Sequence, residues 1–480
     1  MKTLGWMALG LLAALLIAVA AAVVRTLRRP RLVSDYTPDP DPARAEAYAR
    51  ILSAMVRYET VSHREDPEIE KFRGFHALLE KLFPAVHRSL EKTEIDGNLL
   101  FFWRGKYHDA PLVLMSHQDV VPAEGEWLHP PFSGDISDGK VWGRGAADTK
   151  CTLMAFFQAV EELLQTGFVP EQDVYLASSC TEEFGGDGAP KLVAELKRRG
   201  VKPFLVCDEG GGIIGQPVGG VPGYFAMVGV FEKGQGNVRI TARSQGGHAS
   251  APPRNSPIPR LAKFVSSMEK RPPFRKKLLP EVRAMFENLA PYAAFPLRLL
   301  FGNLWLFGPL LRAVMPLVSP QAAAMLRTTA AFTMASGSDA CNVLPQEASV
   351  WANLRFIPHQ GKEASLHALR RRAGKYGLDV EVISAVDPSG SVDIRGEAWG
   401  RVMDAIGECF PGLPASPYVV TGGTDARFYQ EICPSCVRFG PVVYDPEQMK
   451  GMHGLNENIG AACLPGAVDF YKTLIRKNRH

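Results

Sequence analysis

The spacing of apolar and polar residues predicts alternating helices and strands from residue 43 onward. Apolar residues recur at helical spacing over three segments, residues 43–57, 70–82 and 152–166. Short apolar runs predict four strands, at residues 99–103, 112–115, 173–177 and 204–207. This alternation is typical of a largely parallel sheet that is covered by helices on both faces. We therefore predict an α/β fold with a mixed, mostly parallel sheet.

A second pattern occupies the middle of the chain. Residues 225–243 predict two strands broken around 233–236, and four elements follow: a helix at 257–270, a strand at 348–356, a helix at 363–376 and a strand at 378–384. Helices at 396–408 and 460–476 then resume the first pattern. We predict one domain from residues 43–224 and 389–480, and an inserted α+β domain from residues 225–388.

Residues 278–333, inside the inserted unit, are unusually apolar and aromatic. Six prolines interrupt them, together with Arg298 and Arg312. Because proline breaks helices and buried charge is costly in lipid, we do not expect a membrane span here. We predict a bundle of short helices that forms an apolar wall or a dimer surface, with plain core packing as the alternative.

An apolar N-terminal helix is predicted from the uncharged run Leu4 to Val24, whose 21 residues could cross a bilayer. It is longer than a usual signal core, which favours an uncleaved anchor, whereas small residues at 20–22 would suit signal cleavage. Four arginines follow, at positions 25, 28, 29 and 31, and the positive-inside rule would keep that side in the cytoplasm. We predict a protein that is membrane-anchored or secreted, with residues 1–42 as anchor or signal and linker.

The composition is that of a folded globular protein. A length of 480 residues predicts two domains, and 46% hydrophobic with 22% charged residues excludes a disordered chain. The net charge of +4 includes the arginines that follow the first apolar run, so the body is near neutral and no nucleic-acid partner is predicted. The eight cysteines are scattered, and Cys433 and Cys436 lack the second pair that a structural zinc site would need.

Five short islands carry residue types that a two-zinc hydrolase needs. Each follows an apolar run or lies in a glycine-rich turn, and they contain His117 with Asp119, Asp148, Glu182 with Glu183, Asp208, and His453. A metal-bound imidazole needs an acceptor on its other nitrogen, so Asp119 could orient His117 or position a neighbour. Asp148 precedes a helix, where it could cap that helix or bridge two cations.

The adjacent carboxylates of Glu182 and Glu183 suggest a division of labour. If one binds zinc, the other can face the metal-bound water as a general base, because zinc lowers the pKa of its water to about 7. A solvated acidic turn is the alternative for such a pair. His453 supplies the second imidazole that a two-zinc site would still lack.

Three other islands suggest contacts with a substrate. His248 lies in a tight turn of the inserted unit, and Asn342 and Arg355 flank the same predicted strand region. An arginine fork suits a substrate carboxylate, because it can donate two parallel hydrogen bonds. Residues 422–427 form a further glycine-rich turn of the first domain. Each of these islands could equally be structural.

Taken together, the islands resemble a known family. Nearly the whole chain after residue 45 is similar to the zinc aminoacylase and carboxypeptidase family of co-catalytic metallopeptidases, and in particular to its carboxypeptidase S branch. The resemblance rests on motifs that the chain carries at residues 115–122, 130–134, 142–146, 181–183, 208–211, 247–253, 303–310, 422–425 and 453–457. Thr149 departs from the branch, which often has a second aspartate there.

The resemblance implies two zinc ions and a role for each island. His117 and Asp208 would hold one zinc and Glu183 and His453 the other, with Asp148 bridging. Glu182 would be the general base, Asp119 would support His117, and His248 would stabilise the oxyanion, reaching across a homodimer. Asn342 and Arg355 would engage the substrate carboxylate.

The resemblance also implies a catalytic domain with an inserted lid or dimerisation domain, and a lumenal or external location. The implied activity is zinc-dependent cleavage of the amide bond of N-acyl or N-peptidyl amino acids that have a free carboxylate. The apolar segment 278–333 suggests a lipophilic acyl group. An exo-carboxypeptidase or dipeptidase for short peptides is the alternative, and an inactive binding module is the alternative from another class.

Overall fold

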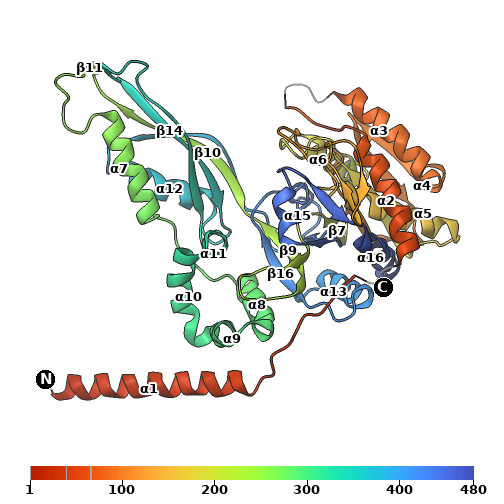
Figure 1. Ribbon diagram of the computed structural model, residues 1–480, viewed down its shortest axis with the longest axis horizontal. Helices are drawn as coiled ribbons and strands as arrows, with labels where there is room; N and C mark the ends of the chain where they lie inside the picture. Colours follow the sequence, from red (N-terminus) through yellow and green to blue (C-terminus); the bar gives the residue numbers. More distant parts are fainter. Residues whose placement is uncertain (1, 39–40, 65–67, 480) are drawn as a thin grey trace.

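A ten-stranded mixed sheet forms the centre of the computed structural model, which describes residues 2–38, 41–64 and 68–479 (Figure 1). Its order is β1 (Glu91–Ile95), β2 (Asn98–Trp103), β6 (Gln172–Ser178), β3 (Tyr107–Met115), β7 (Leu205–Asp208), β17 (Cys436–Arg438), β9 (Tyr224–Glu232), β8 (Gly212–Gly215) and β18 (Val443–Tyr444), with β16 (Ala415–Val420) beside β9. The central strands β6, β3, β7 and β17 are parallel, whereas β1 and β2 pair antiparallel at one edge. The predicted α/β class with a mostly parallel sheet is confirmed.

Alternate residues of the strands pack into two different cores, which is why the strands are apolar throughout. Leu112 and Leu114 of β3 belong to one core, and Val113 and Met115 belong to the other. The first core is covered by α2 (Pro42–Arg57), α3 (Ile69–Leu82), α4 (Pro84–Ser89), α5 (Lys150–Gln165), α13 (Glu397–Cys409) and α16 (Leu464–Lys477). The second is covered by α6 (Gly188–Arg198) and α14 (Ala426–Tyr429).

The inserted unit, called the lid here, is a four-stranded antiparallel sheet with its own core. Its order is β12 (Thr329–Ser336), β14 (Glu347–Phe356), β10 (Gly234–Arg243) and β15 (Asp379–Val386). Helices α7 (Pro257–Lys270) and α12 (Gly361–Gly374) pack into that core. A short ribbon of β11 (Gly247–His248) and β13 (Val343–Leu344) forms its outer tip (Figure 1). The expected strands and helices are present. Strand β12 was not predicted, because its first residues belong to the apolar segment 278–333, for which short helices were predicted.

The two connections between the lid and the rest of the chain run side by side. Only Lys233 separates β9 from β10, so the predicted break is narrower than expected. The backbone N–H of Glu232 donates to Ser389 Oγ at 2.7 Å, and the Ser389 N–H donates to Glu232 O at 3.1 Å. The domain boundaries proposed from the sequence stay a prediction.

The apolar segment is a bundle of short helices, as predicted: α8 (Pro280–Leu289), α9 (Phe295–Gly302), α10 (Leu304–Val318) and α11 (Pro320–Leu326). Its buried residues, among them Val282, Phe286 and Leu326, join the first core of the central sheet and not the lid core. Core packing therefore explains the inner side of the bundle, and the outer side is considered below.

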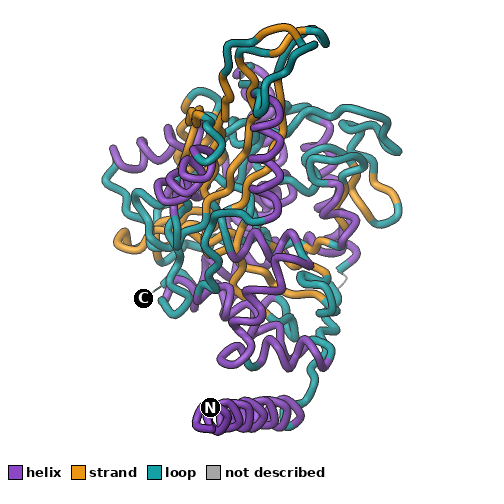
Figure 2. Tube along the Cα trace, turned by 90° about the vertical axis from the view of Figure 1, so that its left-hand side faces the viewer, coloured by secondary structure: helices purple, strands orange, loops and turns teal. Residues whose placement is uncertain are grey.

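Helix α1 (Lys2–Leu27) projects from one edge of the body and is joined to it by a single extended segment (Figures 1 and 2). Over the described residues it is the one helix long and apolar enough, at Leu9–Leu27, to cross a membrane by itself. The predicted N-terminal apolar helix is thus present.

Candidate metal centre

Four of the predicted ligands converge beyond the carboxyl end of the central sheet. The Nε2 atom of His117 lies 3.1 Å from one carboxylate oxygen of Asp148. The Nε2 atom of His453 lies 3.1 Å from the other oxygen of Asp148 and 3.1 Å from an oxygen of Glu183. Donor atoms of His117, Asp148 and Glu183 all lie within 4.8 Å of one another, the arrangement expected of residues that share a cation.

Sheet order explains why residues so far apart in sequence meet. β6, β3 and β7 are parallel neighbours, so the residues that follow them emerge at the same edge. His117 follows β3, Glu183 follows β6, and Asp208 ends β7. His453 follows α15 (Pro446–Gly451) with a φ of 55°, a left-handed backbone conformation that turns the loop sharply.

Asp119 positions both the histidine and the acidic pair. Its backbone oxygen lies 2.9 Å from Nδ1 of His117, and its carboxylate accepts the backbone N–H groups of Glu182 at 3.2 Å and Glu183 at 3.1 Å. The same carboxylate accepts the hydroxyl of Ser62 at 2.6 Å. The backbone oxygen of Asp119 therefore orients the imidazole, and its carboxylate holds the loop of the two glutamates.

Two positioning residues, Arg144 and Glu457, were not recognised from the sequence. One oxygen of Glu457 accepts the backbone N–H groups of Ala147 at 2.8 Å and Asp148 at 3.0 Å. Its other oxygen pairs with Arg144 at 2.7 Å, and both side chains are almost fully buried. This contact holds the turn that presents Asp148. The sequence signal for these two residues was that Arg144 lies in the motif at 142–146 and Glu457 in the motif at 453–457.

The site holds more buried acid than base. Burial, reinforced by neighbouring carboxylates, raises the pKa of Glu182, Glu183 and Glu209, and raises those of Asp208 to about 6 and Asp425 to about 7. Burial opposes the charged form of His117, but hydrogen bonds to Asp119 and Asp148 outweigh it and raise its pKa. Hydrogen bonds to Asp148 and Glu183 raise the pKa of His453 to about 10. The whole group therefore favours an added positive charge.

The donor set fits a divalent cation. Oε1 of Glu183 is buried and has no hydrogen-bond partner among the described residues, which is costly unless the atom binds something else. Imidazole nitrogens and carboxylate oxygens are the usual ligands of zinc at such sites. His117, Asp148, Glu183 and His453 can thus hold a metal.

Asp208 is placed differently from these four. Its two carboxylate oxygens accept the backbone N–H groups of Glu209 and Ala426, each at 2.8 Å. The neighbouring Glu209, not singled out from the sequence, interacts electrostatically with Asp148, Asp208 and His117. Two adjacent carboxylates thus compete for the role predicted for Asp208.

The predicted substrate residues lie on the lid, at opposite ends. His248 is exposed at the tip, where Nδ1 lies 2.8 Å from Ser250 Oγ, and Asn342 accepts the N–H of Ala249 there through its backbone oxygen. Arg355 is at the base, at the far end of β14. Asn342 precedes β14 and Arg355 lies near its end, so the two residues flank this strand and lie roughly 30 Å apart. Within one chain, the tip residues do not join the metal ligands (Figure 1).

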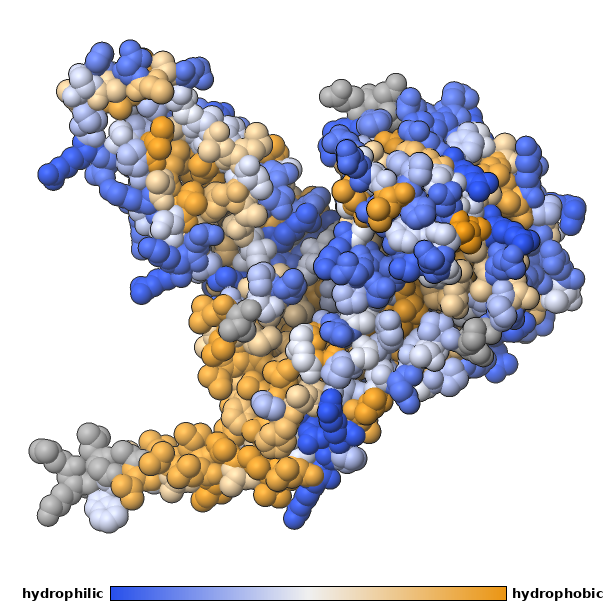
Figure 3. All heavy atoms as spheres, in the orientation of Figure 1, coloured by the Kyte–Doolittle hydropathy of each residue, from blue (hydrophilic) through white to orange (hydrophobic). Residues whose placement is uncertain are grey.

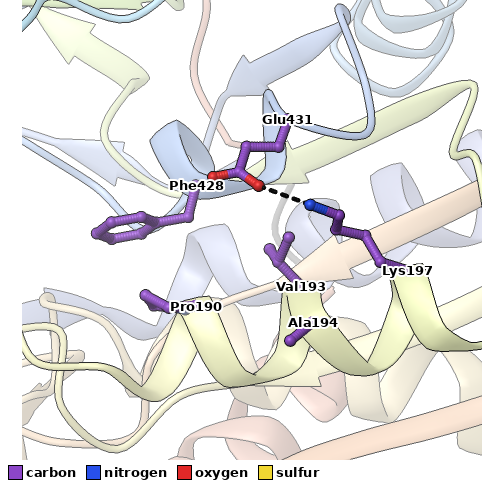
Figure 4. Close-up of a pocket in the computed structure, with 6 residues that line it drawn as sticks. All are labelled: Pro190, Val193, Ala194, Lys197, Phe428 and Glu431. Carbon is purple, nitrogen blue, oxygen red and sulfur yellow. Dashed lines mark hydrogen bonds and ion pairs between the residues drawn. The ribbon is translucent and has the colours of Figure 1, made fainter.

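A separate surface hollow of about 240 Å³ lies between α6 and the segment that begins with α14. Lys197 and Glu431 pair across it at 3.1 Å, above Val193 and Ala194 of α6 (Figure 4). None of its lining residues belongs to the predicted site, so this hollow is distinct from the metal centre.

Residues 113–477 match the family described as "Peptidase family M20/M25/M40". The chain is 35% identical to the N-fatty-acyl-amino acid synthase/hydrolase PM20D1.1 of Danio rerio, covering 91% of this chain and 87% of the relative. It is 33% identical to the probable carboxypeptidase S-like 2 of Dictyostelium discoideum, with coverage of 89% and 84%.

Solved structures share the fold at low sequence identity. The M20 family metallo-carboxypeptidase Sso-CP2 from Sulfolobus solfataricus superimposes with a TM-score of 0.66 at 18% identity, covering 90% of this chain and 99% of the other. Human carnosine dipeptidase 1 superimposes with a TM-score of 0.63 at 16% identity, covering 91% and 96%.

Proposed function

The chain belongs to peptidase family M20/M25/M40, whose members are metal-dependent hydrolases, and from this premise we propose a two-zinc amidohydrolase for N-acyl or N-peptidyl amino acids with a free carboxylate. The observation that carries the proposal is the convergence of His117, Asp148, Glu183 and His453 beside a second, partly buried carboxylate, Glu182. A binding module would have no need for that second carboxylate.

In the proposed assignment, His117 and Asp208 would hold one zinc ion, Glu183 and His453 would hold the other, and Asp148 would contribute a ligand to each. When bound, the metal polarises the scissile carbonyl and acidifies the attacking water. Glu182 would take a proton from the attacking water as the C–O bond forms, and would then deliver it to the amine nitrogen as the amide C–N bond breaks. A carboxylate with a raised pKa suits both transfers, and burial raises the pKa of Glu182.

Arg355 is proposed to bind the substrate carboxylate from the base of the lid. Its Nε and Nη1 atoms donate to Asn353 and Gln235, each at 3.2 Å. Burial, and then the charge of Arg427, lower its pKa. Arg355 and Arg427 repel each other, and a bound anion would offset this repulsion.

His248 and Asn342 are proposed to act on a second copy of the chain. Both lie at the lid tip, away from the metal ligands of their own chain. A homodimer in which each tip reaches the partner's site would give them the predicted roles, with His248 at the oxyanion and Asn342 at the substrate carboxylate.

The preference for a lipophilic acyl group is supported by the likeness to the Danio rerio synthase/hydrolase. The likeness to carboxypeptidase S-like 2 favours the second candidate, an exo-carboxypeptidase or dipeptidase for short peptides.

We also propose that α1 is an uncleaved membrane anchor. Its final turns make buried contacts with the body, and these contacts would be lost if α1 were cleaved off as a signal.

The test is hydrolysis of N-oleoyl-phenylalanine beside a Gly-Leu dipeptide by the full chain in detergent, with and without chelator. Glu182→Gln is compared with Glu171→Gln, a surface carboxylate that pairs with Lys106 at 2.7 Å. The proposal is supported if phenylalanine is released, if chelator abolishes this release, and if Glu182→Gln abolishes it whereas Glu171→Gln does not. Activity on the dipeptide alone moves the assignment to the peptidase, and activity on neither substrate refutes both.

A further inference from the structure

The outer side of the helical bundle carries an apolar surface that the proposed chemistry does not use. Helix α9 and residues 304–317 of α10 meet at an angle of 109°, and we call this pair the elbow. On α10, Leu310, Val314 and Leu317 are exposed on one face at helical spacing, and Trp305 is exposed on the first turn. Leu317 is 81% exposed, which is unusual for a leucine in a folded chain.

This surface continues directly onto α1. Figure 3 shows one hydrophobic area that runs from α1 across the elbow, while the lid and the body carry smaller hydrophobic areas among hydrophilic residues. Trp305 and Phe295 of the elbow are exposed, as are Ile17 and Val24 of α1. A contiguous apolar area of this kind marks an interaction site.

A buried polar contact sets the elbow at a defined level along α1. Asn303, at the corner of the elbow, donates to the hydroxyl of Thr26 at 3.0 Å and is 1% exposed. Ala22, one turn earlier, is also completely buried. The elbow therefore lies beside the last two turns of the apolar helix, immediately before Arg28 and Arg29.

Charged and aromatic residues at this level have the arrangement of a membrane–water interface. Arg25, Arg29 and Arg298 border one hollow beside Asn303, with Glu287 as its single acidic residue. Arginine and tryptophan are favoured where acyl chains meet headgroups, and clustered arginines attract anionic lipids. A second copy of the chain would have to cover α1 as well, because the apolar area is continuous.

We propose that the elbow rests in the interfacial layer of an anionic phospholipid bilayer, with Trp305, Leu310 and Leu317 among the acyl chains and Arg298 at the headgroups. The apolar face of α1 that continues the elbow contacts the same bilayer. The lid and the metal centre are thereby held next to the membrane. The inference concerns placement alone and does not depend on the proposed reaction.

Depth-dependent quenching of Trp305 tests the proposal. The full chain is reconstituted into phosphatidylcholine–phosphatidylserine vesicles, with either ordinary or brominated acyl chains, and the fluorescence of Trp305→Phe is subtracted from that of the wild type. The difference signal is expected to lose most of its intensity in brominated vesicles. An undiminished signal that remains open to aqueous iodide overturns the proposal, and a signal shielded from both quenchers assigns the surface to a second copy, which also overturns it.

Matched variants make the result specific to the elbow. Leu317→Glu is expected to reduce the bromine quenching of Trp305, whereas Val169→Glu, at an exposed apolar position of the central domain, is expected to leave it unchanged. Arg298→Gln is expected to weaken the dependence on phosphatidylserine. Equal quenching in all three variants contradicts the inference. Because no turnover is measured, the same experiment on Glu182→Gln separates this outcome from failure of the proposed function.

Discussion

Replacing Glu457 by glutamine gives the sharpest test of how the metal centre is built. The substitution keeps an oxygen for the backbone N–H groups of Ala147 and Asp148, but it removes the charge that faces Arg144 at 2.7 Å. Both partners are buried, at 3% and 0% exposure of their side chains, so solvent cannot screen the arginine that is left behind. Breaking a buried pair in this way costs about 3–5 kcal/mol.

The consequence for the metal follows from the position of Asp148. Its backbone N–H is held by Glu457, and its two carboxylate oxygens face His117 and His453. Loss of an outer partner typically lowers metal affinity by about 10–100-fold. We therefore expect Glu457→Gln to lower both the free energy of unfolding and the affinity for zinc.

The assay is a set of denaturant titrations and zinc competition measurements on wild type, Glu457→Gln, Arg144→Met and the double variant. The double variant is expected to be much more stable than the sum of the single effects allows, because neither charge is then left unpaired. Additive losses, or a Glu457→Gln protein with wild-type stability and zinc affinity, would refute the reasoning.

Three further outcomes are expected. Asp208→Asn and Glu209→Gln distinguish the two adjacent carboxylates: if Asp208 is the ligand, zinc content falls in the first variant alone, and loss only in the second transfers the role to Glu209. Burial lowers the pKa of Lys233 to about 7, so between that value and its ordinary pKa the unfolded chain binds more protons than the folded chain. The free energy of unfolding of the wild type should therefore rise with pH relative to that of Lys233→Met, by at most about 1.4 kcal/mol per pH unit. Equal profiles of melting temperature against pH for the two proteins contradict this. Mixing inactive His248→Ala with inactive Glu182→Gln should restore part of the activity if the lid tip serves a partner chain, whereas a mixture without activity argues for a role within one chain.

Local pattern was sufficient for most elements of this fold. The helix predicted at 257–270 coincides with α7, because helical spacing marks its one buried side. The runs at 99–103 and 173–177 lie inside β2 and β6, because a continuous apolar run is typical of a strand that is buried on both faces. Strand β12 was not predicted, since a partly exposed strand next to an apolar helical segment has no distinct local signal. Its identity depends on pairing with β14, a contact that lies outside the local pattern of β12 itself.

The sequence by itself determined which residue types are available for metal chemistry, because imidazoles and carboxylates after apolar runs are visible in the linear order. Only the tertiary structure decided which of them meet. Parallel order of β6, β3 and β7 brings His117 and Glu183 to one edge, and the length of β14 keeps Asn342 away from Arg355. Likewise, Arg144 and Glu457 are 313 positions apart and acquire their meaning only as a buried pair. Proximity in a fold is set by sheet order and strand length, which no local window of sequence contains.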